Sequence, residues 1–102
     1  MADASKVGQN LEHKLPQIRA DWARRGFSFE YWIDPAGQIW RDFVHDVDEV
    51  VMLIEGEIEI EFEGSALRPD VGEEVLIPAK ARHTVRNPGS TPNRWCFGYA
   101  SR

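Results

Sequence analysis

The chain carries the stretch FVHDVDEVVMLIEGE at residues 43–57, in which His45 and Glu49 precede an apolar run. The run has the length and composition of a buried strand and closes on Gly56. Because side chains alternate between the two faces of a strand, Glu49 shares a face with Val51, and His45 joins them if the pleat continues. An isolated buried carboxylate is costly to ionise. We therefore expect a cation, a hydrogen-bond donor or a proton beside Glu49.

The segments around this stretch also alternate as strands do. The clearest case is EIEIEFE, where the apolar residues face inward and the glutamates face water. Turn residues such as DPAG separate these segments, which predicts a small all-β sandwich or barrel. We expect strands at residues 27–32, 38–45, 49–55, 57–63, 73–78, 82–87 and 94–100.

The N-terminal part of the chain differs from this β pattern. Its apolar residues recur at helical spacing, as Leu11, Leu15, Ile18 and Trp22. Proline is tolerated only in the first turn of a helix, so Pro16 predicts a helix that starts near Leu15 and ends before Gly26. We expect residues 1–26 to form a tail, disordered over residues 1–9, and a helix that packs on the barrel as a lid or interface. Residues 27–102 would form the barrel.

The composition limits the class of protein. A chain of 102 residues has room for one hydrophobic core, so we expect a single barrel domain. No apolar run approaches the ~18 residues of a membrane helix, and the first ten residues lack the apolar core of a signal peptide. The only cysteine, Cys96, cannot form an internal disulfide and fits a reducing cytoplasm. A small core and four tryptophans favour a homodimer, formed through the aromatic strand at residues 94–100 and the helix.

Acidic side chains are concentrated in the middle of the chain. The net charge is −5, and residues 42–74 hold twelve acidic side chains and one basic side chain. Such a surface repels phosphate backbones, so we do not expect the protein to bind nucleic acid.

A second histidine, His83, shares the phase of its strand with Val85. His45, Glu49 and His83 would form a set of two histidines and one carboxylate, which holds non-haem iron and leaves coordination positions open. Zinc, manganese and nickel accept the same ligands. The alternative is an interior ion pair, in which Glu49 bonds to His83 or to an arginine.

The framework around these residues resembles the cupin superfamily, whose motifs are G-x5-H-x-H-x3-E-x6-G and G-x5-P-x-G-x2-H-x3-N. Eight of the ten motif positions match, over residues 37–87. They are Gly37, His45, Glu49, Gly56, Gly72, Pro78, His83 and Asn87. The resemblance implies an all-β fold, a small double-stranded β-helix (jelly-roll) barrel with a short N-terminal helix.

Two motif positions differ from the family pattern. Phe43 replaces the first histidine, and Lys80 replaces a glycine. In cupins that bind a metal the first position usually supplies a ligand, which a phenyl ring cannot do. Three protein ligands still satisfy a catalytic zinc or facial iron site. The resemblance thus implies a centre held by His45, Glu49 and His83, or a barrel that has lost its metal.

Large aromatic residues suggest a pocket for a small organic ligand beside this centre. The residues expected to line it are Trp40, Phe43, Val51, Val85, Trp95 and Phe97. Trp32 and Tyr99 could line it too, although core and dimer contacts are favoured for most of these aromatic residues. We expect Cys96 to be a small buried apolar residue and Asn87 to form structural hydrogen bonds.

Three functions fit these features. The first is a metal-dependent enzyme, for which the resemblance makes dioxygenase, isomerase or decarboxylase chemistry conceivable. The second is a non-catalytic module that binds a small molecule, and the third is a structural barrel whose former site Phe43 fills. All three predict the same fold, because one barrel can host many functions.

Overall fold

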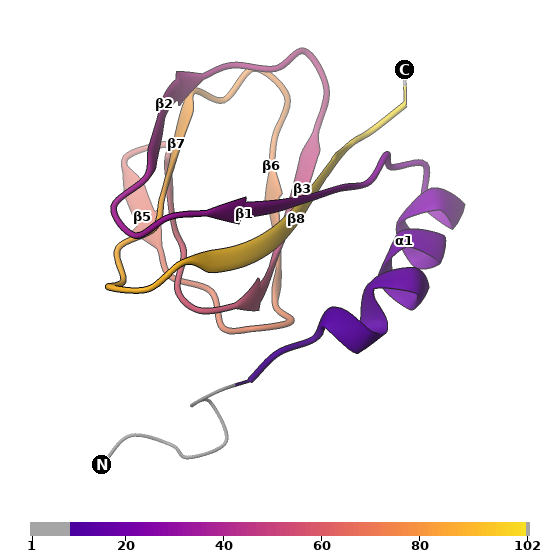
Figure 1. The fold of residues 1–102 in the computed structure, drawn as a ribbon. Coiled ribbons are helices and arrows are strands. Elements are labelled where there is room, and N and C mark those ends of the chain that lie inside the picture. Colours follow the sequence, from indigo (N-terminus) through magenta and orange to yellow (C-terminus); the bar gives the residue numbers. More distant parts are fainter. Residues whose placement is uncertain (1–8, 102) are drawn as a thin grey trace.

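The computed structural model describes residues 9–101, so the disorder expected for residues 1–9 falls, except at Gln9, outside the described chain. Within it, eight strands form two antiparallel sheets that face each other (Figure 1), in the orders β1-β8-β3-β6 and β2-β7-β4-β5. This is the predicted jelly-roll barrel. The strands are β1 (Glu30–Asp34), β2 (Ile39–Phe43), β3 (Glu49–Glu55), β4 (Glu59–Phe62), β5 (Ser65–Leu67), β6 (Glu74–Ile77), β7 (His83–Arg86) and β8 (Asn93–Tyr99).

Strand β5 lies between two of the expected strands, where no strand was expected. It has three residues, all of them exposed. It pairs with β4 at the edge of the second sheet. The sequence gives little sign of such a strand, because an exposed edge lacks the apolar alternation by which strands are recognised.

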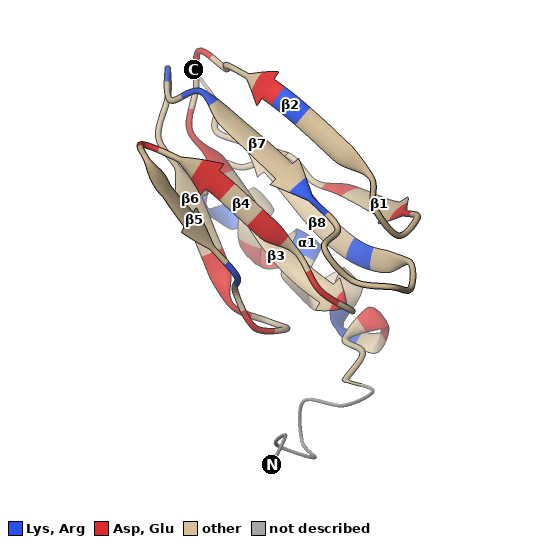
Figure 2. Ribbon diagram, turned by 90° about the vertical axis from the view of Figure 1, so that its left-hand side faces the viewer, with Lys and Arg blue, Asp and Glu red and all other residues tan. Residues whose placement is uncertain are grey.

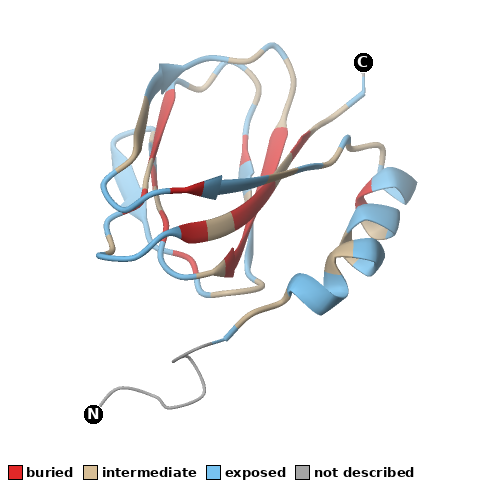
Figure 3. Cartoon of the chain, in the orientation of Figure 1, coloured by how far each residue is buried: buried red, intermediate tan, exposed pale blue. Residues whose placement is uncertain are grey.

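Strand β3 is buried on both faces, which accounts for its unbroken apolar run. Val51 and Leu53 project between the two sheets and pack in the barrel core. Val50, Met52 and Ile54 project from the opposite face, into a second apolar cluster. Figure 3 shows β3 as one of the most buried segments of the chain. A strand covered on both sides needs apolar residues at every position, so the pattern loses its alternation.

Strand β4 has the alternation that the sequence predicted. Ile60 is fully buried, whereas Glu59 and Glu61 lie on the outer surface of the second sheet. Arg86 of the neighbouring strand β7 reaches both carboxylates, at 3.2 Å and 3.1 Å. Figure 2 shows these acidic positions on β4 beside basic ones on β7. The charged face is thus partly neutralised by cross-strand ion pairs.

Helix α1 (Leu15–Arg24) has Pro16 in its first turn, as predicted, and follows a short 3-10 turn, η1 (Glu12–Lys14). Its apolar stripe covers the outer face of the first sheet, where Trp22 is fully buried against Val50 and Cys96. None of the helices within residues 9–101 has the length and apolar character that crossing a membrane requires.

Parts of the surfaces that we expected to form a dimer are buried within the chain. Strand β8 lies between β1 and β3 in the first sheet. The apolar stripe of α1 faces that sheet, and its residue Trp22 is fully buried. These buried parts are not available to a second copy of the chain.

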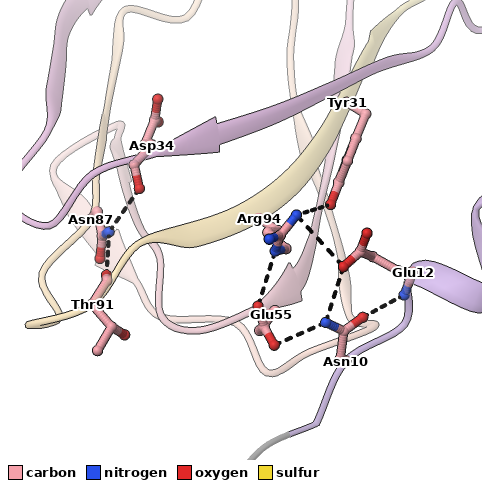
Figure 4. Close-up of polar contacts among 8 residues, drawn as sticks. All are labelled: Asn10, Glu12, Tyr31, Asp34, Glu55, Asn87, Thr91 and Arg94. Carbon is pink, nitrogen blue, oxygen red and sulfur yellow. Dashed lines mark hydrogen bonds and ion pairs between the residues drawn. The ribbon is translucent and has the colours of Figure 1, made fainter.

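Polar contacts fasten the segment before α1 to the first sheet (Figure 4). The amide of Asn10 donates to Glu55, at 2.9 Å. Arg94 donates to the other oxygen of the same carboxylate and to the hydroxyl of Tyr31, at 3.1 Å and 3.0 Å. Glu12 lies 3.6 Å from Arg94. These contacts fix where the chain enters the helix.

Candidate metal centre

A bulge in β2 turns two aromatic side chains toward the space between the sheets. Trp40 and Phe43 are three residues apart, yet they pair with two residues of β7 that are two apart. The extra residue is accommodated near Asp42, which has a φ of +57° and whose N–H donates to the hydroxyl of Thr84. Trp40 and Phe43 can therefore share a face, which strict alternation forbids.

The structure brings together the three residues proposed as ligands. His45 follows β2, Glu49 begins β3 and His83 begins β7. Glu49 Oε1 lies 3.1 Å from His83 Nε2 and 3.6 Å from His45 Nε2. One ligand atom from each residue lies within 4.8 Å of the other two. The side chains of Glu49 and His83 are 5% and 3% exposed, and that of His45 is 27% exposed.

The geometry of these contacts suits a shared cation. Among the described residues, none donates a hydrogen bond to the buried Glu49 Oε1. Two ligand atoms that each lie ~2.1 Å from one ion are separated by about 3.0 Å in an octahedral site and about 3.4 Å in a tetrahedral one. The observed separations of 3.1 Å and 3.6 Å are close to these values.

The backbone selects the tautomer of His83 that a metal requires. His83 Nδ1 lies 3.1 Å from the carbonyl oxygen of Ala81. A carbonyl oxygen can only accept, so Nδ1 carries the proton and Nε2 presents its lone pair to Glu49. Metal-ligating histidines usually have such a partner on their other nitrogen.

A proton can occupy the same place as the metal. Burial lowers the pKa of His83, but Glu49 and the Ala81 carbonyl outweigh burial, and the net pKa of His83 is raised. A protonated His83 would pair with Glu49, which is the ion pair that the sequence analysis left open. Metal ions and protons compete for a histidine nitrogen.

Tyr99, one of the aromatic residues that we expected could line the pocket, belongs to this site. Its hydroxyl lies 3.4 Å from His45 Nε2. Burial, with a smaller contribution from the charge of Glu49, raises the pKa of Tyr99 to about 12. The phenol therefore stays protonated at neutral pH and can donate to His45. The signal for it was the alternation of β8, which puts Tyr99 in phase with Trp95 and Phe97.

The three residues line a cavity of about 190 Å³, and we call the part of the cavity beside them its floor. The lining residues are Trp32, Trp40, Phe43, His45, Glu49, His83, Val85, Trp95, Phe97 and Tyr99. Val51, which we expected to line the cavity, packs in the core instead. Among the described residues no lysine or arginine lines the cavity, and α1 contributes no side chain to it. The helix is therefore not a lid over this cavity.

Asp34, at the end of β1, was not expected to take part in the site. Its side chain is buried, and Asp34 Oδ2 accepts from the indole N–H groups of Trp40 and Trp95, at 2.9 Å and 3.0 Å. The sequence offered no signal for this role, because the DPAG context indicates an exposed turn.

Two other residues take the structural roles expected of them. The amide of Asn87 donates to the carbonyl oxygens of Pro35 and Thr91, and its oxygen accepts from Gly89. Cys96 is fully buried, and burial raises the pKa of its thiol to about 12.

A jelly-roll barrel with two histidines and a carboxylate converging on an interior cavity defines a class of small β-barrels with a candidate metal centre. The family model for the cupin domain matches residues 30–99, and the chain belongs to this family.

Solved structures share the fold. The TT1209 protein of Thermus thermophilus is 26% identical, with a TM-score of 0.68, and the match covers 74% of this chain and 73% of that one. The cupin domain of an XRE family transcriptional regulator from Enterobacter cloacae is 21% identical, with a TM-score of 0.69 and coverage of 78% and 86%. The DMSP lyase DddQ of Ruegeria pomeroyi is 22% identical, with a TM-score of 0.66 and coverage of 74% and 39%. A search of curated proteins found no match.

Proposed function

We propose that this chain binds one divalent metal ion through His45, Glu49 and His83, and binds a small organic molecule in the cavity above them. The observation that carries the proposal is Glu49 Oε1, a buried oxygen without a donor that lies close to two imidazole nitrogens. A bound ion would supply Lewis-acid chemistry. Iron, manganese, nickel and zinc all accept this ligand set.

Phe43 supports an open centre rather than a closed structural one. Its ring lies 6.1 Å from that of His45 and 6.3 Å from that of His83, and lines the cavity. With three protein ligands, positions remain for a ligand from the cavity, as in catalytic metal sites. We therefore favour a metal-dependent enzyme, or a module that recognises its ligand at the metal.

A second candidate is a binding module without metal. The raised pKa of His83 favours it, since a protonated His83 would neutralise Glu49. Either candidate would bind a small molecule, so the presence of metal distinguishes them.

Metal analysis of the purified protein tests the proposal. We expect about one divalent ion per chain after incubation with a metal salt and gel filtration, and a loss of at least tenfold in affinity in His45→Ala and in His83→Ala. His13→Ala is the matched control, because His13 is an exposed histidine outside the site. A metal-free wild type, or a variant pair that binds as well as His13→Ala, would exclude the metal centre.

Restoring the missing motif histidine gives a gain-of-function test. Phe43→His places an imidazole beside His45 and His83, so we expect metal affinity to rise about tenfold or more as a fourth ligand is added. Titration with a competing chelator measures the change. Phe43→Leu is the control, since it removes the ring without adding a ligand. Equal affinity in the two variants would show that residue 43 does not face the ion.

We also propose a cytoplasmic homodimer. The single cysteine, Cys96, supports a reducing compartment. Ile33 supports the dimer, because it is 51% exposed on β1, an edge strand of the first sheet. Light scattering on the purified protein would measure its mass.

A further inference from the structure

Asp34 holds two walls of the cavity through one oxygen. Trp40 comes from the second sheet and Trp95 from the first, and the indole N–H groups of both donate to Asp34 Oδ2. Asp34 is only 3% exposed. Its position is fixed by the backbone, because β1 pairs with β8 at this residue and the Asp34 carbonyl accepts from Asn87.

This arrangement leaves no free polar atom on the part of the cavity that Trp40 and Trp95 line. The indole N–H is the only polar group of a tryptophan side chain, and it can only donate. With both N–H groups bound to Asp34, Trp40 and Trp95 present carbon atoms to a ligand. Phe43, Phe97 and Val85 add further apolar surface. The remaining polar side chains of the lining lie at the floor, in His45, Glu49, His83 and Tyr99.

The size of the cavity limits what can fill this apolar part. Its volume is about 190 Å³. An engineered cavity of about 150 Å³ binds benzene. The cavity therefore suits a body of the size of one substituted six-membered ring. A sugar or a phosphate ester would leave several polar groups without partners against the aromatic walls, at a cost for each of them.

We propose that Asp34 is a positioning residue that determines specificity, and that the cavity takes a compact ligand with a planar apolar body and one carboxylate. The apolar body lies against Trp40 and Trp95, and the carboxylate faces the floor. The sign of that charge rests on the proposed function, because no lysine or arginine of residues 9–101 lines the cavity and the bound ion would supply the positive charge there. Without an ion, the aromatic walls and Glu49 would instead suit an organic cation.

Binding of simple probes to the zinc-loaded full chain tests the inference. Tryptophan fluorescence and calorimetry would give the Kd values of benzoate, acetate and tetramethylammonium. We expect benzoate to bind at least tenfold more tightly than acetate, because only benzoate fills the apolar part. Benzoate that binds no better than acetate, or less tightly than tetramethylammonium, would overturn the proposal.

Variants of Asp34 separate positioning from a general structural role. Asp34→Asn keeps an acceptor for both indoles, so we expect benzoate affinity within about threefold of wild type. Asp34→Ala frees both N–H groups, and we expect about a tenfold or larger loss of benzoate affinity with acetate and zinc affinity unchanged. Glu74→Ala is the matched control, since it frees the indole of Trp22 on the far side of the sheet. A melting temperature that falls in Asp34→Ala while the ratio of benzoate to acetate affinity stays constant would contradict the inference.

If Asp34→Ala does not fold, a pair of variants at Trp40 tests the inference instead. Trp40→Phe keeps an apolar ring without an N–H group, so benzoate affinity should stay within about threefold. Trp40→Gln adds polar atoms to the wall and should lose at least tenfold. Equal affinity in the two variants would overturn the inference. Its failure is distinct from that of the proposed function, because zinc binding is measured without benzoate.

Discussion

Lys80 has a backbone conformation that glycine adopts far more easily. Its φ is +73°. It stands where the cupin motif has a glycine, and the motif glycines of this chain, Gly37, Gly56 and Gly72, also have positive φ. The glycine positions of the motif thus mark turns of the backbone, whereas its histidine and glutamate positions mark the site. A residue with a side chain costs roughly 1–2 kcal/mol in this left-handed backbone conformation. The strain is located at the site, because the N–H of Lys80 donates to the carbonyl of His45 at 2.7 Å.

We predict that Lys80→Gly stabilises the protein by about 1 kcal/mol, because the relief of strain exceeds the entropy that glycine gains in the unfolded chain. The exposed ion pair of Lys80 with Asp46 contributes little to oppose this gain. Urea denaturation would measure the free energy of unfolding. Lys80→Ala is the control, since it removes the charge and keeps the Cβ. A destabilised Lys80→Gly would mean that the lysine side chain outweighs the strain.

At the scale of elements, α1 is anchored to the first sheet by Glu74 at the start of β6. Arg25 donates to both oxygens of this carboxylate, at 2.8 Å and 2.9 Å, and the indole of Trp22 donates at 3.1 Å. The guanidinium of Arg25 is the main cause that lowers the pKa of Glu74, and burial opposes it. Both side chains are partly exposed, at 42% for Arg25 and 31% for Glu74, so water screens the pair.

This lowered pKa makes the anchor dependent on pH. A carboxylate whose pKa is lower in the folded state adds stability above the pKa of the unfolded chain, about 4.3 for glutamate. The added stability is lost as the pH falls through the folded pKa. We predict that Glu74→Gln lowers the free energy of unfolding by about 0.5–1 kcal/mol at pH 7, and that the difference from wild type shrinks as the pH falls below about 4.

Urea denaturation of wild type and variant across this pH range would measure the difference. Glu63→Gln is the charge-matched control, because Glu63 is exposed in the turn before β5. A difference between wild type and Glu74→Gln that stays constant with pH would show that the charge of Glu74 does not anchor the helix. An equal loss in Glu63→Gln would assign the effect to net charge.

At the scale of the whole molecule, the sequence was sufficient for the fold because its motif spacing and its alternation agree. Glu49 and Val51 are two residues apart, so alternation predicts that their side chains share a face. The carboxylate of Glu49 does lie in the barrel interior, where it lines the cavity. What could not be predicted depends on contacts between distant segments. The bulge at Asp42, which lets Trp40 and Phe43 share a face, has no local sequence signal. Asp34 has the sequence context of a turn residue, and its role emerges only when β1 is placed beside the two indoles that it binds.

Strand β3 packs against the barrel core on one face and against the helix on the other, because it supplies side chains to both apolar clusters. A larger residue at Val51 would push the strand toward the helix, and a larger residue at Met52 would push it toward the cavity floor. Interiors packed at crystal density transmit such displacements instead of absorbing them. Substitutions accepted on one side of β3 during evolution should thus be matched by compensating changes in volume on the other. Among related sequences, the residues of the helix stripe and those of the barrel interior would then vary together, although they never touch.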